Sequence, residues 1–379
     1  MRQRLARSSR WVIKIGSALA TNAGQGLNTM AIDRWSDAMV RRLEERKDIA
    51  VVTSGAVAAG MTRLQWGQRP RKLQQLQAVA AVGQMELVRA WELAFSRHNR
   101  HAAQILLTHD DLVQRERYLN SRSTLLELLS IGVVPVINEN DTVAIEELRV
   151  GDNDTLAGLV CNLLDADLLI ILTDQEGLYS ADPRTDPGAE LVTHGVAGDP
   201  ALEALAGGSG TWGRGGMRTK LRAAQLAARS GTSTIIASGA DAAVIDRIAG
   251  GEAVGTLLEA RAQKLAARKQ WLAGIGEPRG RLALDRGAVE VLTRRGRSLL
   301  PVGVVSVGGE FARGELVVCC DEGGREVARG LTNYSAAEAR KVAGLASEAI
   351  ADVLGYMHEP ELIHRDNLVI SGAAPADDG

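Results

Sequence analysis

Aromatic residues are scarce in this chain, where Phe, Trp and Tyr together account for 3% of the 379 residues. Cysteine is scarcer, with three residues, of which Cys319 and Cys320 are adjacent. So few cysteines at such spacings make neither a disulfide framework nor a metal site, which favours the cytoplasm over an oxidising compartment. No apolar run approaches the roughly 20 residues that a membrane-spanning helix needs. The composition therefore excludes a disulfide-stapled scaffold and argues against a membrane protein.

Neither sign of charge dominates, because 44 Lys and Arg oppose 46 Asp and Glu for a net charge of −2. Nothing in that balance requires a polyanionic partner. The chain is longer than the size at which one hydrophobic core usually stops growing, so we expect two domains. Residues 1–10 are rich in Arg and Ser without an apolar core, and we interpret them as a tail rather than a targeting peptide.

The most informative stretch lies between Ile131 and Asp174. Strand, polar cluster, second polar cluster, helix and strand follow one another there, at 131–137, 138–141, 151–154, 155–164 and 168–172. This is the βαβ pattern of a parallel sheet, in which ligands bind beyond the carboxyl ends of the strands. A single Asp or Asn before a helix is explained as an N-cap. Two clusters rich in Asp and Asn exceed that need, so we weigh a binding site above a cap.

Lys14 interrupts the first buried-type strand, Trp11 to Ile15, just before a Gly-Ser turn. A lysine in such a strand can carry its ammonium to water at the edge of a sheet. Alternatively, it places a fixed positive charge in the crevice at the strand end. The small residues 54–60 after a second strand at 48–53 also allow two interpretations, a tight turn or a close approach of a ligand to backbone N–H groups.

A glycine pair, Gly215 and Gly216, precedes Thr219, Lys220 and the helical run 221–229. Backbone donors, a hydroxyl and an ammonium at a helix start are phosphate-binding chemistry. The segment is not a Walker A loop, because no Gly-Lys-Ser/Thr sequence closes it. A glycine hinge before a helix is common, so this signal alone is weak.

Strands and helices, including a helix over 110–129, alternate as far as Ile236, which predicts a layered α/β/α domain with a mainly parallel sheet. After a boundary near 277–280, short strand-like segments at 283–284, 302–307, 315–320 and 327–331, separated by glycine-rich turns, predict a small β-rich domain. The expected division is a tail, an α/β domain, a linker, a β-rich domain and a second tail, at 1–10, 11–262, 263–279, 280–358 and 359–379.

Six motifs occur in order along the chain: Val-Ile-Lys-Ile-Gly-Ser at 12–17, Ser-Gly-Ala at 54–56, Ile-Asn-Glu-Asn-Asp at 137–141, Gly-Asp-Asn-Asp at 151–154, Leu-Thr-Asp-Gln-Glu-Gly-Leu-Tyr at 172–179 and Gly-Gly-Met-Arg-Thr-Lys at 215–220. Jointly they are specific, and with them the chain resembles the glutamate 5-kinases of the amino-acid kinase family. Residues 280–355 resemble the PUA domain that many bacterial members carry. In the glycine loop Arg214 and Arg218 replace a Thr and a small residue of the family pattern, so Lys220 is the most secure part of that loop.

The resemblance implies an activity, the ATP-dependent phosphorylation of the γ-carboxylate of L-glutamate to L-glutamyl 5-phosphate, the first step of proline biosynthesis. A glutamate side chain with a pKa of about 4.3 is already ionised at neutral pH, so this nucleophile needs no general base. The difficulty is to bring one anion up to a triphosphate, so we expect catalysis by positioning and charge neutralisation. Mg²⁺ is expected to be held by phosphates and water rather than by a protein cage.

The resemblance also implies roles for individual residues. Lys14 and Lys220 would flank the transferred phosphoryl group, and Asp154 would hold both ammonium groups. The substrate-binding residues would be Ser54, Asn138, Asp141, Asp152 and Asn153. The nucleotide-binding residues would be Lys14, Gly16, Ser17, Thr173, Asp174, Arg214, Gly215, Gly216, Met217, Arg218, Thr219 and Lys220.

The implied partners are L-glutamate, proline as a feedback inhibitor, further copies of the chain in a dimer or tetramer, and a functionally coupled glutamate-5-semialdehyde dehydrogenase. A close alternative is another acid kinase of the same fold, acting on aspartate, acetylglutamate, carbamate or a nucleoside monophosphate. The Asp- and Asn-rich clusters favour glutamate, because they supply counter-charge for a free α-ammonium. A protein that binds RNA through the PUA-like domain is disfavoured, because acidic residues outnumber basic ones beyond Gly280 and stacking aromatics are few.

Overall fold

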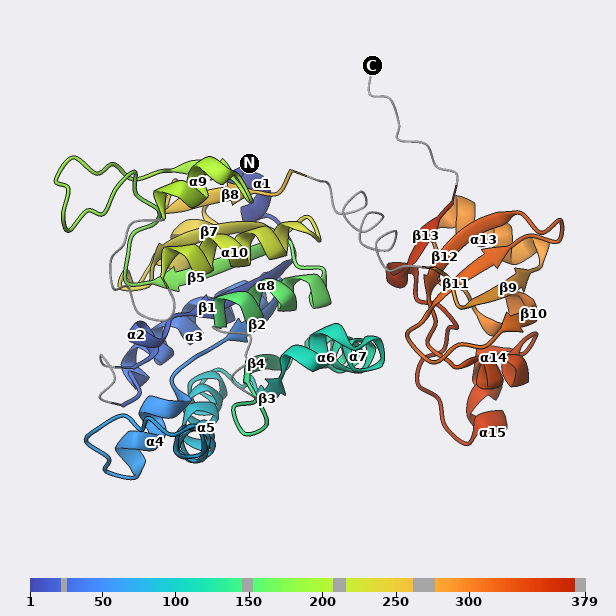
Figure 1. Ribbon diagram of the computed structural model, residues 1–379, viewed down its shortest axis with the longest axis horizontal. Helices are drawn as coiled ribbons and strands as arrows, with labels where there is room; N and C mark the ends of the chain where they lie inside the picture. The colour runs from blue at the N-terminus through green and yellow to red at the C-terminus, as the bar shows by residue number, and fades with distance from the viewer. Residues whose placement is uncertain (22–25, 145–152, 207–215, 262–276, 372–379) are drawn as a thin grey trace, which may run out of the picture. The chain divides into compact units, whose positions relative to one another are not determined.

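The computed structural model describes residues 1–21, 26–144, 153–206, 216–261 and 277–371 (Figure 1). The chain divides into two compact units, Met1–Leu112 with Ser121–Ala267, and Val113–Asn120 with Arg268–Gly379. Each unit has its own β-sheet. The change of unit after Ala267 lies outside the described ranges, so the predicted domain boundaries stay predictions.

The first unit is built on an eight-stranded sheet with the strand order β3-β4-β2-β1-β5-β7-β8-β6. Its strands are β1 Arg10–Ile15, β2 Asp48–Val52, β3 Ala102–Leu107, β4 Val134–Glu139, β5 Leu168–Thr173, β6 His194–Val196, β7 Ser233–Ser238 and β8 Thr256–Glu259. Neighbouring strands pair in parallel, except for the antiparallel pair β7 and β8. The prediction of a mainly parallel sheet is therefore confirmed.

Helices cover both faces of this sheet. The described helices up to residue 261 are α1 Arg2–Ala6, α2 Ser17–Ala20, α3 Thr29–Glu44, α4 Ala56–Arg63, α5 Leu73–Ser96, α6 His109–Val113, α7 Arg115–Ser130, α8 Asn153–Leu164, α9 Pro200–Leu205, α10 Met217–Ala228 and α11 Val244–Ala249. On one face, Ile13 and Ile15 of β1 join a core that includes buried side chains of α3, α5 and α11. α8 and α10 pack against each other and against β1, β5 and β7 (Figure 1). Because side chains alternate along a strand, Lys14 points to the face opposite Ile13 and Ile15, where α8 lies.

Two predicted elements have different bounds in the structure. The strand predicted over 131–137 is β4, which begins later because Gly132 makes a turn with φ of 76° and Ile131 is exposed. Since β4 also ends later, Asn138 belongs to a buried strand and not to a loop. The helix predicted over 110–129 is divided into α6 and α7.

Two helices begin before the predicted helical runs 155–164 and 221–229. α8 starts at Asn153 and α10 at Met217. The sequence pattern does not predict these starts, because a mainly polar first turn carries no apolar periodicity. The earlier starts bring Asp154 and Lys220 into the first turns of these helices.

Both predicted tails contain folded structure. Residues 2–6 form α1, where the guanidinium of Arg2 donates hydrogen bonds to backbone carbonyl groups beside β8. Residues 359–371 contribute Leu362 and Ile363, both 0% exposed, to the core of the second unit. The structure therefore places these residues within the folded units, where the sequence predicts tails.

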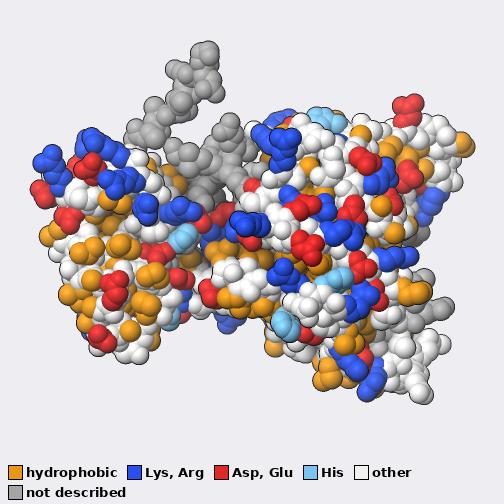
Figure 2. Space-filling model, turned by 180° about the vertical axis from the view of Figure 1, so that it is seen from behind, with side chains coloured by type: hydrophobic (Ala, Val, Ile, Leu, Met, Phe, Trp, Pro, Cys, Tyr) orange, Lys and Arg blue, Asp and Glu red, His pale blue; other side chains and the backbone are white. Residues whose placement is uncertain are grey.

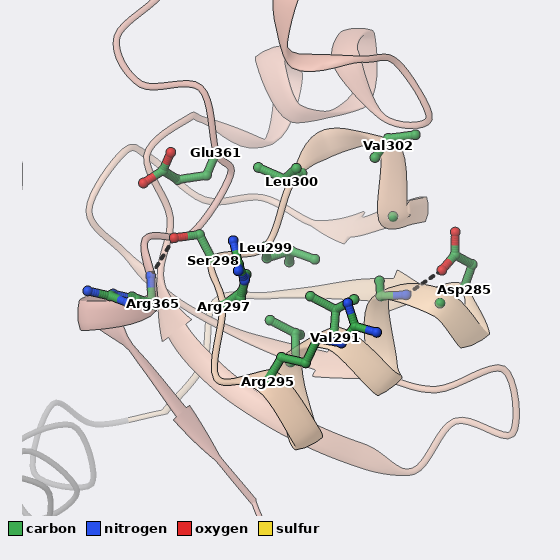
Figure 3. A pocket seen from close by; sticks show the side chains of 14 residues that line it. Asp285, Val291, Arg295, Arg297, Ser298, Leu299, Leu300, Val302, Glu361 and Arg365 are labelled. Atoms are coloured by element: carbon green, nitrogen blue, oxygen red, sulfur yellow. Dashed lines mark hydrogen bonds between the residues drawn. The ribbon is translucent and has the colours of Figure 1, made fainter.

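The second unit holds a five-stranded sheet with the order β10-β9-β11-β12-β13. Its strands and helices are β9 Gly280–Leu284, α13 Arg286–Arg295, β10 Val304–Gly309, β11 Leu316–Cys320, β12 Glu326–Leu331, α14 Ala336–Val342, α15 Ile350–Leu354 and β13 Leu368–Ile370. Strands predicted over 302–307, 315–320 and 327–331 correspond to β10, β11 and β12, so the small β-rich domain is confirmed. A hollow of about 790 Å³ in this unit has an apolar lining from α13 and from Leu299 and Leu300, with arginines at its border (Figure 3).

The mixed charge of the surface and the state of the cysteines agree with what the amino-acid composition indicates. On the first unit, Lys and Arg side chains are interspersed with Asp and Glu over the face that Figure 2 shows. The three cysteines are buried and form no disulfide bond. Within the described ranges, no helix is both long and apolar enough to cross a membrane. The cytoplasmic location stays a prediction.

Candidate active site

The carboxyl ends of four neighbouring strands meet at one edge of the first unit's sheet. In the register of this sheet, Lys14 of β1 lies beside Val52 of β2 and Ile171 of β5, and Val52 lies beside Ile137 of β4. The residues that follow on these strands share the same edge: Thr53, Ser54, Asn138 and Thr173. Parallel sheets bind ligands beyond this edge.

Three buried charged side chains from three elements meet here, and we call them the lysine–aspartate cluster. Oδ1 of Asp154, on α8, lies 2.5 Å from Nζ of Lys14, and Oδ2 lies 3.1 Å from Nζ of Lys220 on α10. Asp154 is 0% exposed and each lysine is 5% exposed. The Lys14 contact is a buried ion pair. The hydroxyl of Thr219 also donates to Oδ2 of Asp154, at 2.6 Å.

Close packing of α8 on α10 explains how the cluster forms. A Cβ on Gly158 would lie 2.6 Å from the carbonyl oxygen of Ala223, so glycine is required for this approach. The first turns of both helices then stand over the end of β1, with Asp154 and Lys220 facing Lys14. Since β1 is a central strand, the interpretation of Lys14 as an edge lysine is wrong.

The electrostatics of the cluster favour an anionic ligand. Burial by itself would raise the pKa of Asp154, but the attraction of the Lys14 and Lys220 ammonium groups, with their hydrogen bonds and that of Thr219, outweighs burial and lowers this pKa below its ordinary value. Within the cluster itself, two ammonium groups face one carboxylate. In a site nearly closed to water, an ammonium group attracts an anion more strongly than it would on the surface.

A second set of polar groups, which we call the amide relay, consists of the backbone carbonyl of Thr53 and the side chains of Ser54, Gln84, Asn138 and Asn153. Nδ2 of Asn153 donates to the backbone carbonyl of Thr53, to Oγ of Ser54 at 2.8 Å and to Oδ1 of Asn138 at 2.8 Å. Nδ2 of Asn138 donates in turn to Oε1 of Gln84 on α5, at 2.7 Å. The structure thus brings three of the predicted substrate-binding residues into direct contact.

Asp141 lies in the loop after β4, near Gln84 of the amide relay. It lines a hollow of about 500 Å³ together with Asn140, Thr142 and Gln84. A carboxylate and an amide therefore border the same space.

The residues predicted to bind nucleotide lie at two neighbouring places. Thr173 ends β5 and its hydroxyl donates to Oδ1 of the exposed Asp174, at 3.0 Å. The N–H of Gly16 donates to the carbonyl oxygen of Leu172, at 3.0 Å, so a backbone donor toward a phosphate at this turn would have to come from Ser17 or beyond.

The start of α10 is the second place. Gly216 precedes the helix, and Met217, Thr219 and Lys220 lie in its first turn. Arg218 is exposed and borders a hollow of about 570 Å³. Asp152, Arg214 and Gly215 lie outside the described residues.

Sequence reasoning missed Gln84, although a signal for it exists. Leu76, Ala80, Leu87 and Trp91 form the buried stripe of α5 at helical spacing, and Gln84 occupies a position on that stripe. A polar residue on a buried stripe needs a polar partner, which points to a network.

A layered α/β unit with two buried lysines and a carboxylate at its strand ends has chemistry that suits phosphate groups, as in the phosphotransferase class of protein. The model of the amino acid kinase family matches residues 9–238, and that of the PUA domain matches residues 280–354. The chain belongs to the amino acid kinase family.

Close relatives extend along the whole chain. Glutamate 5-kinase of Pseudomonas syringae pv. syringae (strain B728a) is 59% identical over 371 residues, which cover 98% of this chain and 100% of that protein. Glutamate 5-kinases of Pseudomonas fluorescens (strain Pf0-1) and Ectopseudomonas mendocina (strain ymp) are 58% identical with the same coverage. A solved UMP kinase from Bacillus anthracis aligns with 67% of this chain and 97% of its own at a TM-score of 0.49 and 15% identity, a likeness that carries no argument. The resemblance to the glutamate 5-kinases is confirmed.

Proposed function

We propose that this chain transfers the terminal phosphoryl group of ATP to the γ-carboxylate of L-glutamate, forming L-glutamyl 5-phosphate in the first step of proline biosynthesis. The observation that carries the proposal is the lysine–aspartate cluster at the strand ends, in a chain 59% identical over 371 residues to a protein named glutamate 5-kinase. Membership of a kinase family makes ATP the phosphoryl donor.

The proposed reaction needs no proton transfer. An oxygen of the γ-carboxylate forms a bond to the γ-phosphorus of ATP, the bond from that phosphorus to the β,γ-bridging oxygen breaks, and ADP leaves. The attacking carboxylate, with a pKa of about 4.3, is ionised at neutral pH. Lys14 and Lys220 would neutralise the charge on the transferred group, and Asp154 would keep their ammonium groups in fixed positions.

The amide relay and Asp141 suit the acceptor. The carboxylate of Asp141 would pair with the α-ammonium of glutamate, while the amide and hydroxyl groups of Ser54, Asn138 and Asn153 would donate to its carboxylates. Asp152 is assigned to the same role from the resemblance.

The nucleotide would lie between β5 and α10, against Thr173, Asp174 and the first turn of α10. We assign Mg²⁺ to the phosphates of the nucleotide and to water, because Mg²⁺ usually keeps several waters and binds through substrate phosphates rather than in an all-protein cage. Inhibition by proline, assembly into a dimer or tetramer, functional coupling to a glutamate-5-semialdehyde dehydrogenase and a cytoplasmic location belong to the same proposal.

A substrate survey tests this function. ADP release would be measured with glutamate, aspartate, acetylglutamate, carbamate and nucleoside monophosphates, with hydroxylamine trapping of an acyl phosphate. We expect release and trapping with glutamate. Equal or faster turnover of another acid would replace glutamate as the substrate, and salt-dependent tRNA binding without ADP release would favour the RNA-binding alternative.

Asp141→Ala should raise KM for glutamate at least about 30-fold, because a buried ammonium loses its carboxylate partner. KM for ATP should stay nearly constant. Asn153→Ala should act in the same direction more weakly, because it loses an amide hydrogen bond and not a charge. Both KM values and the melting temperature would be measured for each variant.

Asp186→Ala is a control, since Asp186 is also a loop aspartate, and its side chain accepts a backbone hydrogen bond from Gly188. If Asp141→Ala melts early but binds glutamate normally, Asp141 is a structural cap, whose loss costs about 1 kcal/mol, and the substrate assignment is wrong.

A chain ending at Gly276 should fold and keep its kinase activity, because every residue proposed for the site lies before that point. Circular dichroism, thermal unfolding and ADP release would check this. An insoluble or inactive fragment would show that the first unit depends on the second.

A further inference from the structure

We propose that Gln84 is a positioning residue for acceptor binding, which fixes the direction of the amide relay from outside the site. The inference rests on the proposed function of Asn138 and Asn153 as acceptor-binding residues. Gln84 belongs to none of the sequence motifs of the site, and it reaches the relay from α5.

The direction of the relay follows from one backbone group. The carbonyl of Thr53 can only accept, so the side-chain nitrogen of Asn153 must face it. The same nitrogen then faces Asn138, which must turn its oxygen toward Asn153 and its nitrogen toward Gln84. Gln84 therefore has to present its oxygen, because any other assignment of the three amides would bring two nitrogens or two oxygens together.

The fold holds Gln84 in this place with close backbone packing. A Cβ on Gly83 would collide with the carbonyl oxygen of Ala56, and a Cβ on Gly60 would collide with that of Val79. α5 is therefore pressed against α4, the helix that directly follows the strand end at Thr53 and Ser54 (Figure 1). Gln84, next to Gly83, is carried to the end of β4, where it meets Asn138.

The amide nitrogen of Gln84 does not stabilise the fold. Gln84 is 8% exposed, and its Nε2 is buried without a hydrogen-bond partner in the part of the chain that the structure describes. A buried donor without a partner destabilises a fold, so stability alone does not account for glutamine at this position. The acceptor oxygen toward Asn138 is the feature that glutamine supplies and an apolar side chain of similar size does not.

Loss of this acceptor would free the amide of Asn138 to rotate. The amide nitrogen of Asn138 could then face the amide nitrogen of Asn153. The hydrogen-bond donors that would bind glutamate would no longer share one orientation. Among the described residues, Gln84 makes no hydrogen bond or ion pair with the lysine–aspartate cluster, so ATP binding should be preserved. The expected signature is a selective loss of acceptor affinity.

The test uses the full chain with Gln84→Met and, as a second apolar replacement, Gln84→Leu. KM for L-glutamate should rise about ten- to a hundredfold, the range expected when buried polar groups lose a partner. KM for ATP should remain within about twofold, and the melting temperature should stay near that of the wild type, because the unpartnered Nε2 is removed as well. Thr232→Val is the matched control, since Thr232 is fully buried and donates one neutral hydrogen bond, to Ala166, away from the relay. It should leave both KM values unchanged.

A double-mutant cycle with Asn138→Leu decides whether Gln84 acts through Asn138. If it does, Gln84→Met adds little to KM for glutamate once Asn138 is replaced. Full additivity, an unchanged KM in the single variants, or a parallel rise of both KM values with early melting in both apolar variants would each overturn the proposal. Wild-type turnover is measured first. If glutamate gives no ADP, the proposed function fails, and Gln84 is then tested with the acid that the wild type does phosphorylate.

Discussion

Asp154→Asn is expected to lower kcat at least about a thousandfold, because electrostatic preorganisation is the largest contribution in sites of this kind. Asparagine keeps the shape of the side chain but removes the charge between Lys14 and Lys220. The two ammonium groups then repel each other and lose their fixed positions. The same change should destabilise the fold by about 3 kcal/mol, as breaking a buried ion pair does.

Asp165→Asn provides the control for this change. Asp165, just after the last residue of α8, accepts a hydrogen bond from the buried Arg122 at 2.7 Å. Its replacement breaks a largely buried ion pair by the same chemistry, and we expect reduced stability with kcat unchanged. If Asp154→Asn retains more than about a tenth of the wild-type kcat, the cluster does not carry the transition-state charge.

The lowered pKa of Asp154 makes its stabilising effect depend on pH. Folding favours the ionised carboxylate, so this contribution is fully present above the ordinary value of 3.8 and is lost as the pH falls through the lower folded value. The difference in melting temperature between the wild type and Asp154→Asn should therefore be constant near neutral pH and shrink once the pH falls below the ordinary pKa of 3.8. A difference that grows on acidification would contradict the assignment.

Lys220→Ala is expected to lower kcat by about a hundred- to ten-thousandfold with little change in KM for glutamate. Lys220 is 5% exposed and holds a carboxylate at 3.1 Å, so its ammonium is already oriented before the substrates bind. Its charge matters most when negative charge spreads over the transferred group, which is a property of the transition state. Steady-state kinetics with both substrates would separate kcat from the two KM values.

Lys47→Met controls for the loss of a buried lysine as such. Lys47 is 8% exposed and donates to the backbone carbonyls of Ala6 and Ser8, outside the site. We expect it to lower stability and leave kcat intact. Near-normal kcat with weaker ATP binding in Lys220→Ala would assign Lys220 to nucleotide binding alone.

Several parts of the site could be predicted because their signals are local. The central strands contain continuous apolar runs, so Lys14 is conspicuous as the one charge within the run from Trp11 to Ile15. Asn138 and Asn153 belong to clusters with more Asp and Asn than capping requires. Gln84 was missed because one glutamine in a long helix has no local signal, and only the buried stripe around it shows that a partner is needed.

Starts of elements were predicted less well than their existence. A mainly polar first turn has no apolar periodicity, so the sequence does not show that α8 starts at Asn153 and α10 at Met217. These starts depend on how each helix packs. The late start of β4 depends on the positive φ of Gly132, a backbone conformation set by the turn after α7.

By itself, the sequence determined that this protein has a mainly parallel α/β domain followed by a β-rich one, and that polar residues gather where apolar strands end. Local periodicity and residue type suffice for that, because each strand or helix shows its own buried face. Only the tertiary structure decided which of those polar residues meet. Asp154 reaches Lys220 across 66 residues, and Asn138 reaches Gln84 across 54. Such contacts depend on glycine-mediated packing of α8 on α10 and of α5 on α4, which brings together backbones that no local pattern relates.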